Sequence, residues 1–280
     1  MIKIICIIGA GTMGSGIAQV AAQSGFATLL FDINNDVLSK AKISIKKSLQ
    51  SLVEKQKITA EESEAIFQRL QFVNDINNCK ADFFIEAIVE KVEAKVSIFN
   101  QLAAINKADA IFASNTSSLS ISDIQKEITN PGRVAGMHFF NPAPIMKLVE
   151  VVKGDQTTDE TAQAVYNLCK QMNKVPVLCK DAPGFIVNRV ARHYYLEAMK
   201  MVENGIASFE NVDAIMEASG FKMGPFKLMD LIGMDVNLAV SQSIYEAFDK
   251  EERFKPSSIQ IDKVVKKELG RKSGKGFYQY

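Results

Sequence analysis

An apolar run that ends in a glycine-rich turn opens the chain and constrains the fold more than any other feature. Residues 2–8 are rich in isoleucine and too few for a stable helix, which is typical of a strand buried on both faces. The turn Gly9-Ala-Gly11-Thr-Met-Gly14 follows at once, and a helix of small residues is predicted over 13–24. The segment therefore predicts a central parallel strand joined to a helix by a turn with little side-chain bulk.

A second strand and an acidic residue extend this pattern. Apolar residues 27–31 predict the next strand, and Asp32 ends it, eighteen residues after Gly14. An acid at that place can accept hydrogen bonds from both hydroxyls of an adenosine ribose and repel a 2′-phosphate, which favours NAD over NADP. The turn alone could be a tight bend without a ligand, but strand, turn, helix and acid together predict dinucleotide binding.

Short apolar runs separated by helical patterns continue as far as residue 178. A long lysine-rich helix is predicted over 35–57. This alternation is typical of a doubly wound α/β sheet of the Rossmann type. The runs lie at 72–73, 83–85, 110–113, 134–137, 148–152 and 175–178.

Proline and glycine at 181–184 interrupt the chain, and only helical patterns follow. We therefore predict an NAD-binding domain over residues 1–182 and an all-helical domain over 183–280 that contributes to substrate binding and dimerisation. A helical domain of this size has little core of its own, so its apolar faces favour docking or pairing. The helical patterns cover 185–204, 209–218, 225–248 and 259–269.

Composition excludes several classes of protein. The formal net charge of +1 provides no overall field for nucleic acid or an anionic membrane, so neither partner is predicted. Four cysteines without a CxxC spacing, together with only two histidines, argue against a metal site and for a reducing compartment. The first apolar run is too short to span a bilayer, and neither a secretory signal nor a transit peptide is expected. We expect a cytoplasmic protein.

The two histidines are the candidates for a general base near neutral pH. His138 follows the predicted strand at 134–137 and precedes a loop with two prolines, where active sites of open α/β sheets commonly lie. Glu150, in the next predicted strand, could hold the second ring nitrogen, although a hydrogen-bonded loop histidine is the alternative. His193 lies inside a predicted helix beside tyrosines, so packing is the simpler interpretation of its ring.

Longer motifs resemble the (3S)-3-hydroxyacyl-CoA dehydrogenase family, in matching order from the first strand to the last residues. They are GAGTMGSGIAQ at Gly9, NTSSLSI at Asn115, HFFNPAPIMKLVEVV at His138, DAPGFIVNR at Asp181 and SGKGFY at Ser273. The motifs at His138 and Asp181 are far more specific than the glycine turn, and the bacterial 3-hydroxybutyryl-CoA branch is the most similar. The resemblance implies an N-terminal NAD domain, a helical C-terminal domain that forms a homodimer, and an active site between them.

The resemblance also implies roles for single residues. His138 takes the proton of the 3-hydroxyl group while NAD accepts hydride, Glu150 orients His138, and Ser117 and Asn188 hydrogen-bond the substrate oxygens. By spacing alone, Ser117 would be an ordinary turn residue and Asn188 a solvated helix residue. Positions that match the family's coenzyme A contacts are Ser48, Lys55 and Ser117. Positions that match its NAD contacts are Gly9, Gly11, Thr12, Met13, Gly14, Asp32, Glu90, Lys95, Asn115, Ser117, Asn141 and Lys275.

The primary hypothesis is the reversible, NAD-dependent oxidation of (3S)-3-hydroxyacyl-CoA to 3-oxoacyl-CoA, with 3-hydroxybutyryl-CoA and acetoacetyl-CoA as the expected pair. One alternative is a dehydrogenase of a free hydroxy acid on a related fold, which would not need the coenzyme A contacts. A second alternative is a module that binds NAD without turnover. The set of Ser117, His138, Glu150 and Asn188 argues against that module.

Overall fold

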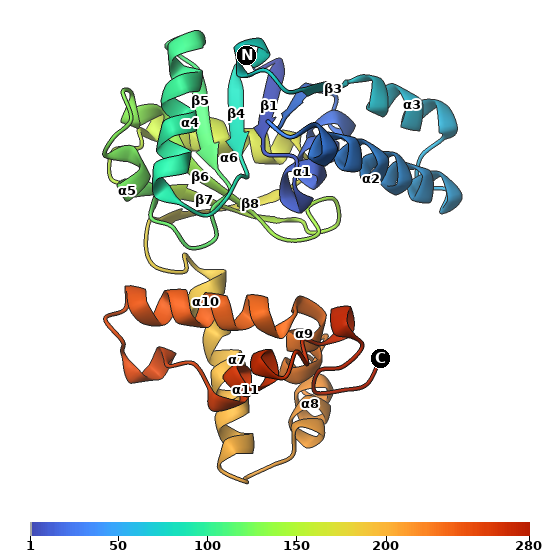
Figure 1. Ribbon diagram of the computed structural model, residues 1–280, viewed down its shortest axis with the longest axis vertical. Coiled ribbons are helices and arrows are strands. Elements are labelled where there is room, and N and C mark those ends of the chain that lie inside the picture. The colour runs from blue at the N-terminus through green and yellow to red at the C-terminus, as the bar shows by residue number, and fades with distance from the viewer. Residues whose placement is uncertain (1) are drawn as a thin grey trace. The chain divides into compact units, whose positions relative to one another are not determined.

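The computed structural model describes residues 2–280, which divide into two compact units between Asp181 and Ala182. The first unit contains a sheet with helices on both faces, and the second consists of helices and the turns between them (Figure 1). Both units confirm the predicted fold class, an α/β sheet followed by an all-helical part.

The sheet of the first unit has eight strands in the order β3-β2-β1-β4-β5-β6-β7-β8. Neighbouring strands from β3 to β6 are all parallel, which confirms the doubly wound, Rossmann-type arrangement. β7 is antiparallel to β6 because only the loop at 140–147 joins the two strands, and β8 is parallel to β7. The strands are β1 (Ile4–Ile8), β2 (Ala27–Phe31), β3 (Leu70–Val73), β4 (Phe83–Glu86), β5 (Ile111–Ser114), β6 (Val134–Phe139), β7 (Leu148–Lys153) and β8 (Val175–Lys180).

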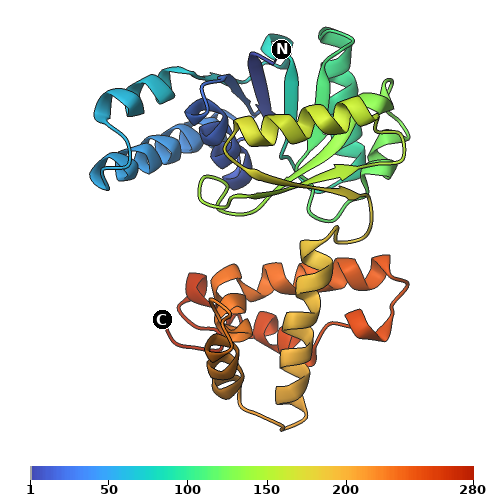
Figure 2. The same ribbon diagram turned by 180° about the vertical axis from the view of Figure 1, so that it is seen from behind.

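Alternate side chains of the buried strands pack against helices on opposite faces of the sheet. Ile7 of β1 shares one core with Ile17 of α1 and Leu168 of α6. On the other face Phe99 of α4 lies 5.5 Å from Phe112 of β5, ring centroid to ring centroid. Figure 1 shows α4 and α5 on the near side of the sheet, and Figure 2, which is seen from behind, shows the yellow-green helix α6 in front of the opposite face. The helices are α1 (Thr12–Gln23), α2 (Asn35–Glu54), α3 (Ala60–Gln68), α4 (Val92–Ile105), α5 (Ile121–Gln125) and α6 (Asp159–Gln171), with 3-10 turns at Ile76–Asn78 and Pro131–Arg133.

The lysine-rich helix predicted over 35–57 is present as α2, but it ends at Glu54. The Asn34 side chain caps its start by accepting a hydrogen bond from the Asp36 amide at 2.8 Å. Gln56 has a left-handed φ of 54°, and the Lys57 amide donates to the Leu52 carbonyl at 2.9 Å. This pattern is a common helix ending, and it places Lys55 just after the helix.

The second unit packs its helices around a core that includes Phe226 and Met229. The helical pattern predicted over 225–248 forms two helices, α9 and α10, which are separated at Gly233 because a right-handed helix cannot contain its φ of 101°. The helix predicted over 259–269 ends at Val265, two residues before Lys267 with a φ of 57°. The helices are α7 (Val187–Glu203), α8 (Phe209–Ala218), α9 (Pro225–Ile232), α10 (Met234–Ala247) and α11 (Ser258–Val265), with 3-10 turns at Glu252–Phe254 and Arg271–Ser273.

Two buried aspartates fasten the end of the chain to this helical unit. Asp230 of α9 accepts hydrogen bonds from the amides of Phe277 and Tyr278 at 3.0 and 2.9 Å. Asp213 of α8 accepts from the Tyr278 hydroxyl at 2.8 Å and from the Phe226 amide at 2.8 Å. Because both carboxylates are almost fully buried, these bonds replace the water that they lose on folding.

Gly14 provides a test of the turn that follows β1. A Cβ atom added there would lie 1.7 Å from the Gly9 carbonyl oxygen, so the backbone has to move to accept any side chain. We expect Gly14→Ala to lower the free energy of unfolding by about 1–3 kcal/mol, measured by urea denaturation. Gly11→Ala is the matched control because a Cβ at Gly11 meets no atom within 4 Å. Equal midpoints for the two variants would contradict this account of the turn.

Candidate functional site

The glycine-rich turn lies where the strand order reverses, between the carboxyl ends of β1 and β4. Gly9 has a φ of 97°, and a Cβ there would lie 2.7 Å from the Ala87 carbonyl oxygen. Open space surrounds the Cβ position of Gly11, and α1 begins at Thr12 and Met13 directly after it. The turn therefore presents the backbone amides of a helix N-terminus to an accessible space, as an anionic pyrophosphate requires.

Asp32 ties the end of β2 to this turn. One carboxylate oxygen accepts a hydrogen bond from the Ala10 amide at 2.9 Å, and the other accepts from the Asn34 amide at 2.9 Å. A carboxylate has about four lone-pair sites, so it retains capacity for two ribose hydroxyls. Turn, helix terminus and half-exposed acid fit the adenosine and pyrophosphate parts of NAD.

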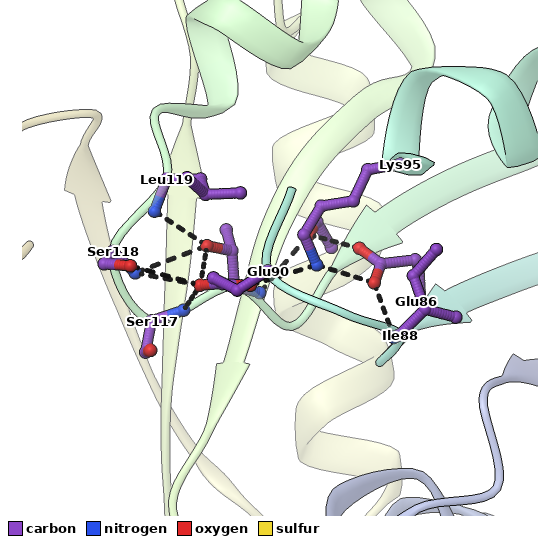
Figure 3. Close-up of polar contacts among 9 residues, drawn as sticks. Glu86, Ile88, Glu90, Lys95, Ser117, Ser118 and Leu119 are labelled. Carbon is purple, nitrogen blue, oxygen red and sulfur yellow. Dashed lines mark hydrogen bonds and ion pairs between the residues drawn. The ribbon is translucent and has the colours of Figure 1, made fainter. Parts of the chain in front are cut away.

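A buried cluster of charges joins the ends of β4 and β5 (Figure 3). The Lys95 ammonium lies 2.6 Å from Oε1 of Glu86 and 3.1 Å from Oε2 of Glu90. Lys95 is 1% exposed and Glu86 is fully buried. The other oxygen of Glu86 accepts from the Ser114 hydroxyl at 2.6 Å, and its Oε1 also accepts from the Ile88 amide at 2.7 Å. Each charge thus has partners of the kind that buried charges need.

Glu90 connects this cluster to the turn that contains Ser117 by hydrogen bonds. Its Oε1 accepts hydrogen bonds from the Thr116 hydroxyl at 2.5 Å and from the Ser117 amide at 2.9 Å. Partial burial would raise the pKa of Glu90, but the Lys95 charge and the bonds from Thr116 and Ser117 keep that pKa below its ordinary value. The ionised form of Glu90 is therefore favoured. Figure 3 shows its hydrogen bonds to the turn at Ser117.

The sequence prediction included Lys95 and Glu90 but missed Glu86, Ser114 and Thr116. Glu86 ends a strand of which every residue is buried, and that pattern of an acid closing an apolar run could have indicated it. Ser114 is its direct neighbour in the parallel register of β4 and β5. No sequence spacing shows that register, so Ser114 could not be found in the same way.

His138 and Glu150 lie directly opposite each other in the antiparallel pairing of β6 and β7. His138 Nδ1 is 2.7 Å from Glu150 Oε2, and the two residues are 6% and 1% exposed. Because a carboxylate oxygen accepts hydrogen bonds, this contact suits the tautomer of His138 with the proton on Nδ1. Phe140 covers the imidazole, with its ring centroid 4.5 Å away. The geometry is that of a histidine oriented by an acid.

Asn115 connects three strand ends around this pair. Its backbone amide donates a hydrogen bond to the Glu86 carbonyl at 2.8 Å, and its side-chain oxygen accepts one from the Phe139 backbone amide at 2.9 Å. The ends of β4, β5 and β6 are therefore fixed together beside His138.

A cleft of about 410 Å³ lies in the first unit between the glycine-rich turn, the α1 and α2 helices and the loop at 141–144. Gly11 and Thr12 line one side of the cleft, Ser48 of α2 another, and Asn141 a third. Lys55 is exposed beyond the end of α2 and is not among the lining residues. The structure thus brings predicted NAD positions and one predicted coenzyme A position to a single cleft.

The remaining predicted residues lie in the second unit. Asn188 is in the first turn of α7, and Lys275 pairs with Glu268 at 2.6 Å. The ring of His193 packs 5.0 Å from that of Phe254, which agrees with a packing role.

Residues 2–280 were searched for a metal site and for a membrane-spanning helix. These residues contain no group of three His, Cys, Asp or Glu side chains arranged to bind a metal ion. None of the helices described there combines the length and apolarity needed to cross a bilayer.

Glu86 provides a test of the charge cluster. Glu86→Gln removes one of the two carboxylates that face the buried Lys95, so we expect the free energy of unfolding to fall by on the order of 3 kcal/mol. Urea denaturation measures the change. The double variant Glu86→Gln with Lys95→Met, which has no buried ammonium, should recover part of the loss. A single variant as stable as the parent would show that the pair does not stabilise the fold.

Comparison with known proteins places this site in a family. The model of the 3-hydroxyacyl-CoA dehydrogenase NAD binding domain matches residues 4–182, and the model of the C-terminal domain of the same family matches residues 184–280. A 3-hydroxyadipyl-CoA dehydrogenase of Escherichia coli is 47% identical over 281 residues, which is 100% of this chain and 59% of that protein. The chain thus spans about three fifths of that relative's length.

Other relatives match over most of their own length. A mitochondrial hydroxyacyl-coenzyme A dehydrogenase of Rattus norvegicus is 41% identical over 100% of this chain and 92% of that protein. The crystal structure of an (S)-3-hydroxybutyryl-CoA dehydrogenase from Ralstonia eutropha has a TM-score of 0.94 and 38% identity, covering 100% of this chain and 99% of that one. Because both family models and these relatives extend along nearly the whole chain, the protein belongs to the 3-hydroxyacyl-CoA dehydrogenase family of NAD-dependent oxidoreductases.

Proposed function

We propose that this protein catalyses the reversible, NAD-dependent oxidation of a (3S)-3-hydroxyacyl-CoA to the 3-oxoacyl-CoA. The observation that carries the proposal is the buried pair of His138 and Glu150 at the end of β6. An oriented imidazole beside a dinucleotide-binding edge suits the removal of a hydroxyl proton, which is the protein's share of alcohol oxidation. The relatives' names support the thioester class of substrate.

The pair acts as a general base and acid. In oxidation, Nε2 of His138 accepts the proton of the 3-hydroxyl group, and Glu150 stabilises the imidazolium that forms. In reduction, the imidazolium returns the proton to the carbonyl oxygen. NAD, when bound, supplies the hydride chemistry. Ser117 and Asn188 hydrogen-bond the substrate oxygens and align the reacting carbon.

We assign the NAD site to the glycine-rich turn and the strand ends around it. Gly9, Gly11 and Gly14 let the pyrophosphate approach the amides of Thr12 and Met13, and Asp32 binds the ribose. Lys95 acts through Glu90, because its own ammonium is buried between two carboxylates. The other proposed contacts are Asn115, Ser117, Asn141 and, from the second unit, Lys275.

We assign the phosphorylated part of coenzyme A to the side of α2 that lines the cleft. Lys40 and Ser48 both line this cleft, and they offer an ammonium and a hydroxyl to a phosphate. Lys55, exposed just after the same helix, adds a second cation, and we assign Ser117 to the thioester. A relative named for 3-hydroxyadipyl-CoA and another for 3-hydroxybutyryl-CoA make the acyl group the point to test.

The reaction and its base are tested together by following NADH absorbance with acetoacetyl-CoA. We expect consumption of NADH with the thioester and little with free acetoacetate or with NADPH. His138→Gln should lower turnover roughly 10²- to 10⁴-fold while NADH still binds.

His193→Gln is the matched control, because that exposed histidine packs against Phe254. A His138→Gln variant with the parent's rate would remove His138 from the mechanism. NADH binding without turnover of any acyl-CoA would favour a binding module instead.

The second unit also supports a homodimer. Leu231 and Ile232 of α9 and Val236 of α10 are 49%, 39% and 47% exposed, although all three are apolar. In a helical unit with a small core, such side chains favour contact with a second copy. We expect light scattering to give twice the mass of one chain, and the double variant Leu231→Glu, Val236→Glu to give the mass of one. A parent protein with the monomer mass would exclude the dimer.

The thiols bear on the compartment. Cys6, Cys79, Cys169 and Cys179 are all free. Free thiols are usual in reducing compartments, which supports the cytoplasmic location that we propose.

A further inference from the structure

A buried lysine lies beneath the loop that forms one side of the cleft. Lys174 follows α6 in the turn before β8 and is 7% exposed. Its ammonium donates hydrogen bonds to the Ala143 carbonyl at 2.5 Å and to the Met146 carbonyl at 2.8 Å. A side chain from one end of the sheet's last crossover therefore reaches the backbone of the loop between β6 and β7.

This loop, residues 141–146, is held by its own hydrogen bonds and by Ala143, which is buried in the core of the first unit. Within it, the amides of Ile145 and Met146 both donate to the Pro142 carbonyl, at 3.0 and 2.9 Å. Ile145 is 72% exposed, so it adds little packing to the first unit. The two carbonyls bound by the buried Lys174 ammonium attach the loop to the turn before β8 by polar contacts as well.

The loop also contacts α1, the helix that follows the glycine-rich turn. A Cβ atom built on Gly16 of α1 would lie 3.2 Å from Cδ of Pro144 and 3.3 Å from Cβ of Ala143. Asn141 to Pro144 line the same cleft as Gly11 and Ser48. A shift of this loop would therefore change the width of the cleft directly.

The charge of Lys174 serves these carbonyls. In the part of the chain that the structure describes, no carboxylate forms an ion pair with it. Burial, and then the nearby Lys147 charge, lower the pKa of Lys174 to about 8, while the Cys169 thiol opposes this shift. The ammonium form still prevails at neutral pH. A buried cation without an acid is costly, and two short bonds to loop carbonyls are the compensation that it has.

We propose that Lys174 is a positioning residue of the ligand cleft: it holds the 141–146 loop against α1 and so sets the cleft for NAD and the coenzyme A handle. The inference rests on the proposed function in assigning these ligands to the cleft. Lys174 acts through the backbone of the loop and touches no reacting atom.

The direct test is amide hydrogen exchange in Lys174→Met, which keeps the length of the side chain but removes its donors. We expect exchange at Ile145 and Met146 to become about tenfold faster or more, while amides of β6 and α6 keep their rates. Lys170→Met is the matched control, because Lys170 is exposed on the last turn of α6. Lys174→Gln retains an amide donor, so its exchange rates at Ile145 and Met146 should lie between those of the parent and of Lys174→Met. The Gln variant takes the place of Lys174→Met in this test if Lys174→Met does not fold.

Ligand binding is the second readout. We expect the dissociation constants of NADH and of coenzyme A, and the KM for acetoacetyl-CoA, to rise about tenfold in Lys174→Met, with kcat within about threefold of the parent. Unchanged exchange at Ile145 and Met146 would overturn the proposal, and so would faster exchange with unchanged NADH and coenzyme A affinities. A parent protein that reduces no acyl-CoA would instead overturn the proposed function, because exchange and NADH binding do not depend on turnover.

Discussion

Parallel strands carry their carboxyl ends to one edge of a sheet, and the candidate site depends on that constraint. β1, β4, β5 and β6 are adjacent in the sheet although about 130 residues separate the first from the last. The glycine-rich turn, Glu86, Asn115 and His138 follow or end these four strands. Their proximity is therefore a consequence of strand order, and the hydrogen bonds between them fix it further.

Buried ionisable side chains at this edge have three different kinds of partner. The Lys95 ammonium is paired with the carboxylates of Glu86 and Glu90. Glu90 also accepts a hydrogen bond from the Ser117 amide and so fixes that turn. His138 lies against the Glu150 carboxylate, which orients the ring through Nδ1. Lys174, among the residues that the structure describes, donates hydrogen bonds to two loop carbonyls and forms no ion pair, so its charge orders the backbone of the loop. The arrangement around Lys95 suits a rigid site, that around His138 suits proton transfer, and that around Lys174 fixes the shape of a loop.

Much of the site could be predicted because its motifs are local. The turn from Gly9 to Gly14 and the acid at Asp32 lie within one strand, helix and strand, where spacing along the chain fixes spacing in space. The pair of His138 and Glu150 was harder to predict, since only an antiparallel β7 places them opposite each other. Glu86 and Lys174 were missed, because their partners Ser114 and Ala143 are 28 and 31 residues away. The break at Gly233 was missed because a single glycine is compatible with either a helix or its end.

Apolar periodicity and contiguous motifs were enough to predict the α/β class, the helical character of the last hundred or so residues and the family, because they need no knowledge of distant contacts. The order of the strands, their register and the charges that share a buried space became visible only in the folded chain. Those properties depend on pairs of residues far apart in the chain, whose contact energies arise only after the sheet has formed.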